Sequence, residues 1–263
     1  MNLNDSASPS FVYAMGRIEP QFPSLGVEKE FAQATGRAKT SGLTDRQALH
    51  KVLTQPENRY LIRQLCWVLT IAGLENYMLV PRDPSDFGSL VETLRREPGP
   101  LDLDVVIGVR GPLAPPEMCN GLMLPILAFD QLYSFDRDSF LQSIPRPDDI
   151  PEDEFKVMAA EIFDRIMLVT DNAGAADEDR ALNYLALRYP AIYERAARSI
   201  RQNASLTAIE ARKSPLSSTR KIIDVTFAYT DRQTDVTEKY LVSVDATEEF
   251  LFLVRRLVHT FDH

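Results

Sequence analysis

Two cysteines, Cys66 and Cys119, are the side chains best suited to chemistry in this chain of 263 residues. Cys119 follows a proline-rich segment and precedes an apolar run, a place where a thiolate nucleophile can lie at the end of a strand. The polar N-terminus lacks the basic and apolar regions of a signal peptide, so we expect a cytoplasmic protein in which a disulfide is disfavoured. The sequence therefore favours two buried thiols that pack as small apolar side chains.

The same pair of cysteines is the candidate metal site. Thiolates bind zinc, and a structural zinc ion takes four protein ligands. The chain has 2 cysteines and no C-x-x-C motif, so one chain cannot build an all-thiolate site; two chains could, each giving Cys66 and Cys119, or one chain could add a histidine. Structural zinc, together with a homodimer that shares it, is therefore an alternative to two packed thiols.

Other nucleophilic patterns are sparse. The chain has 3 histidines, His50, His259 and His263, and no G-x-S-x-G motif. A hydrolytic triad needs a nucleophile on a strained turn with a histidine in reach, and the sequence suggests no such set. His50 and His259 both lie in ordinary helical patterns, where a solvated or packed imidazole is expected.

Phosphate-binding signatures are also missing. The segment Gly108-Val-Arg-Gly-Pro has the wrong spacing for a phosphate-binding loop, and Pro112 lacks the amide hydrogen that would bind a phosphate oxygen. Carboxylates such as Asp104 could act as general acids or bases, but a solvated carboxylate is the ordinary case. The sequence thus favours a non-catalytic protein, with an enzyme that uses Cys119 or a carboxylate as the alternative.

Composition limits the partners. The chain has 29 Lys and Arg residues against 38 Asp and Glu residues, a formal net charge of −9. A surface with this charge repels phosphate backbones and anionic lipids, so we expect neither nucleic acid nor a membrane as a partner. No apolar run approaches the roughly 18 residues that a membrane-spanning helix needs.

Apolar periodicity predicts the elements that carry these residues, after a disordered tail over residues 1–10. The prolines of residues 111–116 predict a stiff loop, and Thr44 stands where a helix N-cap would stand. We expect strands over residues 11–15, 60–70, 77–80, 101–109 and 122–129, and helices over residues 27–35, 44–56 and 83–96.

The second half of the chain predicts an inserted α-helical hairpin over residues 148–213. Its two helices would span 151–170 and 176–212, with a break or kink at Pro190. Residues 148–180 contain 11 acidic and 3 basic side chains, whereas residues 188–221 contain 8 basic and 2 acidic ones. The two helices should therefore attract one another.

The C-terminal region predicts a β-hairpin followed by a helix. Alternation over residues 223–229 and 238–244 is typical of two paired strands, which would offer an edge to an extended peptide. Phe250, Leu253, Val254 and Leu257 then follow helical spacing. We expect an α+β fold in one domain over residues 11–263, with a mixed or antiparallel sheet, the helical hairpin, and this C-terminal β-hairpin plus helix.

Several longer phrases are similar to a known family. They are Phe11-Val-Tyr-Ala-Met-Gly, Pro56-Glu-Asn-Arg-Tyr-Leu-Ile-Arg-Gln-Leu-Cys-Trp-Val-Leu-Thr-Ile, Gly73-Leu-Glu-Asn-Tyr, Val106-Ile-Gly-Val-Arg-Gly-Pro and Cys119-Asn-Gly-Leu. Over nearly its whole length the chain resembles the C-terminal domain of unknown function of the cyanobactin (patellamide) maturation proteins PatG and PatA. The resemblance implies an α+β domain without an established activity that serves ribosomal-peptide biosynthesis, and a metal bound through Cys66 and Cys119. No matched residue brings protease chemistry with it.

Together, the residues and the resemblance favour a non-catalytic accessory protein that binds a precursor peptide or a partner maturation enzyme. Arg59, Arg63, Trp67 and Arg110 lie in the matching phrases and combine cations with an aromatic ring, as peptide-binding surfaces do. Each also has a purely structural interpretation, Trp67 in the core and the arginines in ion pairs with nearby glutamates. The same residues are compatible with a peptide-modifying enzyme or with a dimerisation module.

Overall fold

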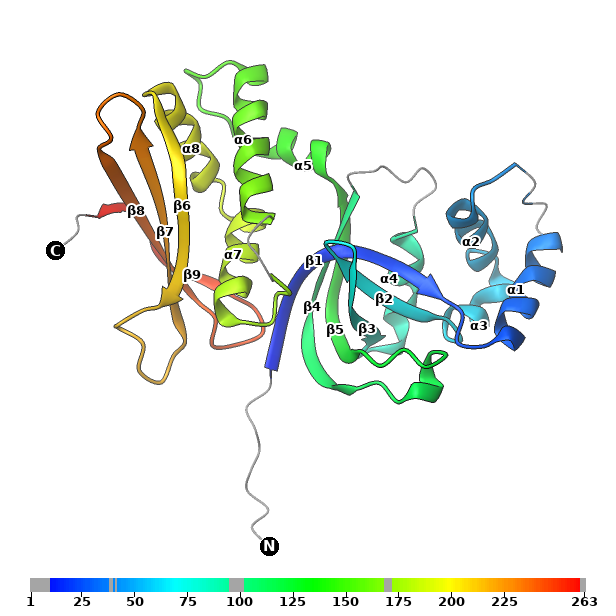
Figure 1. Ribbon diagram of the computed structural model, residues 1–263. Coiled ribbons are helices and arrows are strands. Elements are labelled where there is room, and N and C mark those ends of the chain that lie inside the picture. Colours follow the sequence, from blue (N-terminus) through cyan, green and yellow to red (C-terminus); the bar gives the residue numbers. More distant parts are fainter. Residues whose placement is uncertain (1–9, 38–39, 41, 95–101, 168–171, 261–263) are drawn as a thin grey trace, which may run out of the picture. The chain divides into compact units, whose positions relative to one another are not determined.

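The computed structural model describes residues 10–37, 40, 42–94, 102–167 and 172–260 (Figure 1). The chain forms two compact units, Met1–Asp136 and Arg137–His263. Each unit combines helices with strands, and one of the two sheets is mixed while the other is antiparallel, which confirms the predicted α+β class. The expected tail over residues 1–10 lies outside the described residues, apart from Ser10, which begins the first strand.

The first unit is built on a closed five-stranded barrel with the strand order β1-β2-β3-β5-β4. The strands β3 and β5 pair in parallel, and the other neighbours are antiparallel. Buried apolar residues from the strands form its core, among them Ile18, Leu69 and Phe129. The strands are β1 (Ser10–Gln21), β2 (Cys66–Ile71), β3 (Leu74–Pro81), β4 (Asp102–Leu113) and β5 (Pro125–Asp136).

Short helices connect these strands. The Thr44 N-cap prediction is confirmed, because its side chain accepts a hydrogen bond from the backbone N–H of Gln47 and the Gln47 side chain accepts one from the backbone of Thr44. Between β1 and β2 lie α1 (Leu25–Arg37), α2 (Asp45–Leu53), the 3₁₀ turn η1 (Pro56–Asn58) and α3 (Arg59–Ile62); between β3 and β4 lie η2 (Pro84–Asp86) and α4 (Phe87–Glu92).

The strand expected over residues 60–70 begins later than predicted. Pro56 opens η1, because its fixed φ and missing N–H suit the first turn of a helix, and the turn continues directly into α3. Extended structure then starts only at Cys66. The apolar run was therefore interpreted correctly as buried, but its first part is helical.

The prediction of two separate thiols is wrong. Cys66 at the start of β2 and Cys119 in the β4–β5 connection, which follows the 3₁₀ turn η3 (Pro116–Met118), form a disulfide. Both residues are buried, as expected, in a cluster with Val68, Met78 and Ala114. The β4–β5 connection folds back over β2 and β3 in this cluster, and this places the two Cα atoms 6.0 Å apart.

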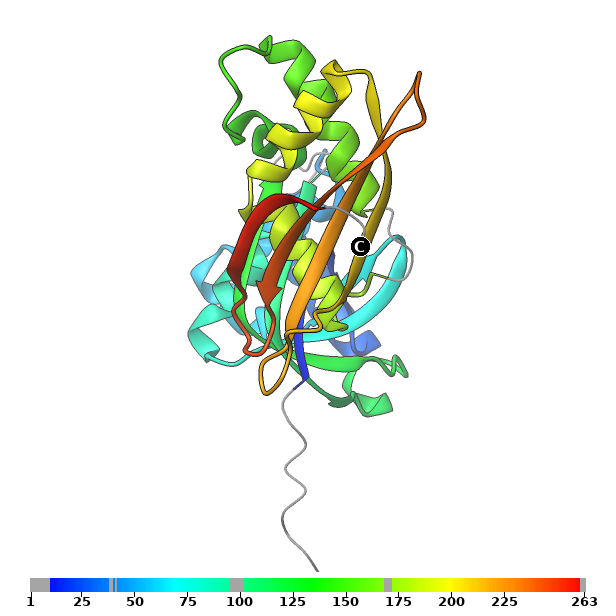
Figure 2. The same ribbon diagram turned by 90° about the vertical axis from the view of Figure 1, so that its left-hand side faces the viewer.

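The second unit packs helices on an antiparallel sheet with the order β6-β7-β8-β9. Helix α7 contacts β6 and β7, and α8 contacts β6. Figure 2 shows the sheet with these helices behind it. The helices are α5 (Arg137–Ser143), α6 (Glu152–Met167), α7 (Asp177–Arg188) and α8 (Ala191–Arg201), and the strands are β6 (Ala204–Lys213), β7 (Ile222–Asp231), β8 (Thr237–Asp245) and β9 (Phe252–Thr260).

The helical segment over residues 148–213 is shorter than predicted. Pro190 separates α7 from α8, as expected, but the last part of the segment is strand β6 and not helix. Pairing with β7 determines this conformation, because Leu206 and Ile209 lie opposite Tyr229 and Phe227. The predicted attraction between the charge blocks is confirmed at Arg201 of α8, whose guanidinium lies 3.8 Å from the Glu154 carboxylate of α6.

The C-terminal region differs most from the prediction. The β7–β8 hairpin is confirmed, but residues 252–260 form the strand β9 where a helix was expected. Backbone pairing with β8 outweighs the helical spacing of the apolar residues, because β9 supplies hydrogen-bond partners to one side of β8. Both strands of the hairpin are therefore interior strands, and the edges of the sheet are β6 and β9.

Candidate functional site

An open cleft in the first unit has a volume of about 510 Å³. One wall comes from the end of α2 and from α3, and the other comes from η2 and α4. The buried side chains of Leu53, Ile62 and Val91 give the cleft an apolar lining. The remaining lining residues are Thr54, Arg59, Arg63, Pro84, Ser85, Phe87, Gly88 and Glu92.

Two arginines predicted from the sequence lie together in this cleft. Arg59 and Arg63 are four residues apart, at the start and just after the end of α3, and both are exposed. The Arg63 guanidinium carbon lies 5.5 Å from the centroid of the Phe87 ring, within the range of a cation–π contact. Neither guanidinium forms an ion pair with a carboxylate in the part of the chain that the structure describes, so the expected pairing with a glutamate is not realised there.

The opposite wall is held by a short capping interaction. Asp83 Oδ1 accepts a hydrogen bond of 2.8 Å from the backbone N–H of Ser85, at the start of η2. This hydrogen bond lowers the pKa of the Asp83 carboxyl from its ordinary value. Glu92 at the end of α4 adds the one carboxylate among the described lining residues, so this part of the lining carries two positive charges against one negative charge.

The lining residues determine what the cleft can do chemically. They include no cysteine or histidine, and their two hydroxyls, on Thr54 and Ser85, have no neighbouring base in the lining. Two guanidinium groups above an apolar surface can instead hold a carboxylate and an adjoining apolar side chain. Such a combination occurs in peptides that carry acidic residues or a free C-terminus.

The structure does not bring the other two predicted binding residues into the cleft. Trp67 is 1% exposed, and its Nε1 donates a hydrogen bond of 2.9 Å to the carbonyl oxygen of Ile62. This side chain therefore supports the end of α3 from within the core. Arg110 lies on β4, where it pairs with Ser10 and Leu127, and it is exposed but does not line the cleft.

The disulfide changes what the cysteines can offer a metal ion. Bonded to each other, Cys66 and Cys119 present no thiolate, and neither can act as a nucleophile in this state. No group of three or more His, Cys, Asp and Glu side chains suited to a metal occurs among the described residues. The oxidised pair therefore does not fit a zinc site, and the zinc prediction concerns a reduced pair that gains ligands from elsewhere.

Asp104, considered as an acid or base, lies within the barrel wall and is 3% exposed. Its carboxylate accepts hydrogen bonds from the backbone N–H of Ile18, at 2.7 Å, and from the hydroxyl of Ser134. These bonds tie β4 to β1 and β5, which is a structural role.

Sequence reasoning missed the second wall of the cleft. The segment over residues 83–96 was predicted only as a helix, and none of its side chains was singled out for binding. No spacing signal connects residues 84–92 with Arg59 and Arg63, because tertiary packing alone brings the two segments together.

Comparisons with known proteins identify a family and a fold. The family model described as "PatG Domain" matches residues 11–224. A solved structure titled "PatG Domain of Unknown Function" matches with a TM-score of 0.75 at 18% sequence identity, and the match covers 95% of this chain and 98% of that chain. No curated protein sequence matches the chain. Among the helices that the structure describes, none has the length and apolar character needed to cross a membrane.

Proposed function

The chain belongs to the PatG domain family, and from this premise we propose that it is a non-catalytic accessory protein of ribosomal-peptide biosynthesis of the cyanobactin type. It acts in the cytoplasm and binds a precursor peptide or a partner maturation enzyme. The cleft between α3 and α4 is the binding site, and Arg59 and Arg63 are its principal binding residues.

One observation carries this proposal: two exposed guanidinium groups share an apolar cleft and have no ion-pair partner among the described carboxylates. An arginine can bind a carboxylate through two parallel hydrogen bonds, and a pair of arginines four residues apart can bind two carboxylates in one peptide. The apolar surface of Leu53, Ile62 and Val91 supplies contact area for a neighbouring side chain.

Calorimetric titration with a cognate precursor peptide tests the proposal. We expect Arg59→Ala and Arg63→Ala each to weaken binding about tenfold, which corresponds to one charge-assisted hydrogen-bonded contact. Lys29→Ala on α1 is the matched control, because Lys29 is an exposed cation outside the cleft. Equal affinity of the double arginine variant and the parent protein would rule out this cleft as the binding site.

The same variants separate the two kinds of partner. Loss of binding to a partner maturation enzyme, with peptide binding unchanged, assigns the cleft to the enzyme. Loss of peptide binding alone assigns it to the precursor. A peptide-modifying activity that persists in the purified protein and disappears in Asp104→Asn or after Cys119→Ala would contradict the non-catalytic role.

A further inference from the structure

The two helical segments that form the walls of the cleft line it with the same spacing of residues. Residues three and four positions apart lie on one side of an α-helix, and the lining residues of both segments are spaced in this way. They are Arg59, Ile62 and Arg63 on the α3 side, and Gly88, Val91 and Glu92 on the α4 side. Ile62 and Val91 are buried whereas the three charged side chains are exposed, so the apolar part of the lining lies deeper than the charges.

Gly88 leaves open space on the α4 side of the cleft. It is exposed, and a Cβ atom added to it would have no neighbouring atom within 4 Å. Its backbone is helical, so the conformation of the chain does not require a glycine here. Apart from proline, glycine is the least favourable residue inside a helix. Glycine at this position therefore costs helix stability and gives the cleft space that another residue would fill.

The two walls differ in charge. Arg59 and Arg63 give the α3 side two positive charges, and Cβ atoms four positions apart on a helix are separated by about 6 Å. The described lining residues of the α4 side include no cation, and their one carboxylate belongs to Glu92, one helical turn after Gly88. A ligand with negative charge along one side and an apolar group on the other matches these two walls.

We propose that the cleft binds an extended segment with the pattern acidic–apolar–acidic, and that Gly88 determines how large the central side chain can be. Alternate side chains of an extended chain point to opposite sides, and those two positions apart are separated by about 6.6 Å. Two carboxylates with this separation can contact Arg59 and Arg63 together. The side chain between them then points to the α4 side and occupies the space in front of Gly88. This inference rests on the proposed binding of a peptide in the cleft.

Other occupants match the lining less well. A basic segment would place its cations against Arg59 and Arg63, where like charges repel. A single carboxylate, such as a free C-terminus, would use one of the two guanidinium groups and leave the other without a partner. A segment with a small central residue would leave the space in front of Gly88 unfilled and lose apolar contact area.

The test uses the full chain and the probe peptide acetyl-Ser-Glu-Leu-Glu-Ser-amide, compared by calorimetric titration with its counterpart that has Ala in place of Leu. We expect the wild-type protein to bind the Leu probe about tenfold more tightly, because more apolar surface is buried. The variant Gly88→Leu should lose this preference, because its own side chain fills the space. A leucine favours the helix, so this variant should fold.

Gly36→Leu is the matched control for the glycine replacement. Gly36 is an exposed glycine of α1 outside the cleft lining, and a Cβ atom added to it would also have no neighbour within 4 Å. This variant should keep the tenfold preference for the Leu probe. Circular dichroism confirms that both variants are folded.

The outcomes separate this inference from the function on which it rests. A wild-type protein that binds neither probe nor a precursor peptide overturns the proposed function, and this inference with it. Equal affinity of the wild-type protein for the two probes, or a preference for Leu that survives in Gly88→Leu, overturns the role of Gly88 alone.

Two further measurements test the acidic residues of the pattern. A probe with Lys in place of both Glu residues should bind at least tenfold more weakly than the acidic probe, and tighter binding would overturn the acidic pattern. Glu92→Gln should strengthen binding of the acidic probe about threefold, because a like charge leaves the opposite wall. Weaker binding by this variant would show that Glu92 contacts the ligand favourably, and it would overturn the assignment of the α4 side to an apolar group.

Discussion

Cys66 and Cys119 are joined by a disulfide although they lie 53 positions apart in the sequence. One cysteine begins β2, and the other lies in the β4–β5 connection. The bond holds this connection over Val68 and Met78 and so covers an apolar part of the barrel wall.

Reduction of this disulfide should destabilise the first unit. Chain-entropy arguments for a loop of this size give about 4 kcal/mol, because the unfolded chain regains the freedom that the cross-link removed. Urea unfolding of oxidised and reduced wild-type protein measures the difference directly. A Cys66→Ala/Cys119→Ala variant should behave like the reduced protein, and an unchanged unfolding midpoint after verified reduction would contradict the prediction.

Zinc should bind only after reduction. The oxidised sulfurs have no thiolate to donate, whereas reduced Cys66 and Cys119 could share an ion with a second chain. Elemental analysis and native mass spectrometry, with and without a reductant, distinguish these states. About half a zinc ion per chain in a reduced dimer, lost in Cys119→Ser, would support a shared site. Metal-free monomer under both conditions would remove the zinc and dimer predictions.

Binding in the cleft should weaken as salt is added. The guanidinium groups of Arg59 and Arg63 are exposed, so their attraction to a carboxylate is screened once the Debye length falls to a few ångströms, near 1 M salt. The affinity for a precursor peptide, measured by titration, should be at least tenfold lower at high salt than at low salt. The Arg59→Ala/Arg63→Ala variant should lose most of this salt dependence, whereas the Lys29→Ala control should keep it.

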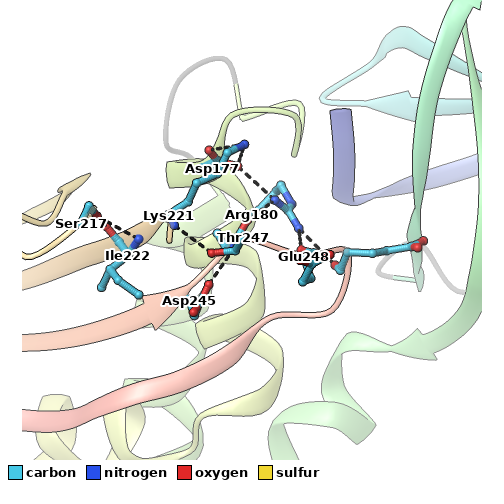
Figure 3. A network of polar contacts seen from close by, with 10 residues as sticks. Asp177, Arg180, Ser217, Lys221, Ile222, Asp245, Thr247 and Glu248 are labelled. Carbon is cyan, nitrogen blue, oxygen red and sulfur yellow. Dashed lines mark hydrogen bonds and ion pairs between the residues drawn. The ribbon is translucent and has the colours of Figure 1, made fainter. Parts of the chain in front are cut away.

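Loss of the Arg180 guanidinium should destabilise the second unit. Burial lowers the pKa of Arg180 from its ordinary value, and the neighbouring Asp177 (Figure 3) opposes this effect in part. Arg180→Met would leave the carbonyl oxygens of Ala246, Glu248 and Glu249 without their donor, at a cost of about 3 kcal/mol or more. Denaturant unfolding measures this loss. Arg198→Met is the control; this exposed arginine pairs with Glu194 at 3.1 Å, and its loss should cost less than about 1 kcal/mol.

Stability should also fall at alkaline pH. Burial raises the pKa of Tyr193 and of Tyr229 well above the ordinary tyrosine value. Because the folded state disfavours both phenolates, the two neutral tyrosines contribute their full stabilisation of the fold below pH of about 10. This stabilisation declines at higher pH, where the tyrosines of the unfolded chain ionise. Ultraviolet absorbance of tyrosinate, followed with circular dichroism, should show these two rings ionising together with unfolding. Tyr193→Phe should reduce the loss of stability at alkaline pH. Ionisation of both rings in a protein that is still folded would contradict this prediction.

Short-range patterns in the sequence predicted several elements correctly. Thr44 with Gln47, the break at Pro190 and the alternation of the β7–β8 hairpin depend on residues a few positions apart. Their hydrogen bonds and dihedral preferences are local, so the sequence contains all that is needed to predict them.

Long-range pairing explains the failures. Residues 252–260 have helical spacing, yet they form β9 because β8 offers a ladder of backbone partners. In the same way, Cys66 and Cys119 meet because the β4–β5 connection folds back on β2. Neither outcome can be recognised from the pattern of residues in a sequence segment of ten or fifteen positions.

The residues of the candidate site show the same difference between local and long-range information. The amino-acid sequence was sufficient to identify Arg59 and Arg63 as candidate binding residues, but it predicted a strand from residue 60, and the two cations are neighbours because α3 places residues four apart on one face. It could not show that Trp67 is buried beneath α3, or that Phe87 and Glu92 of another segment complete the cleft. Those relationships were decided by packing around the barrel, since burial and proximity between distant segments exist only once the whole core has formed.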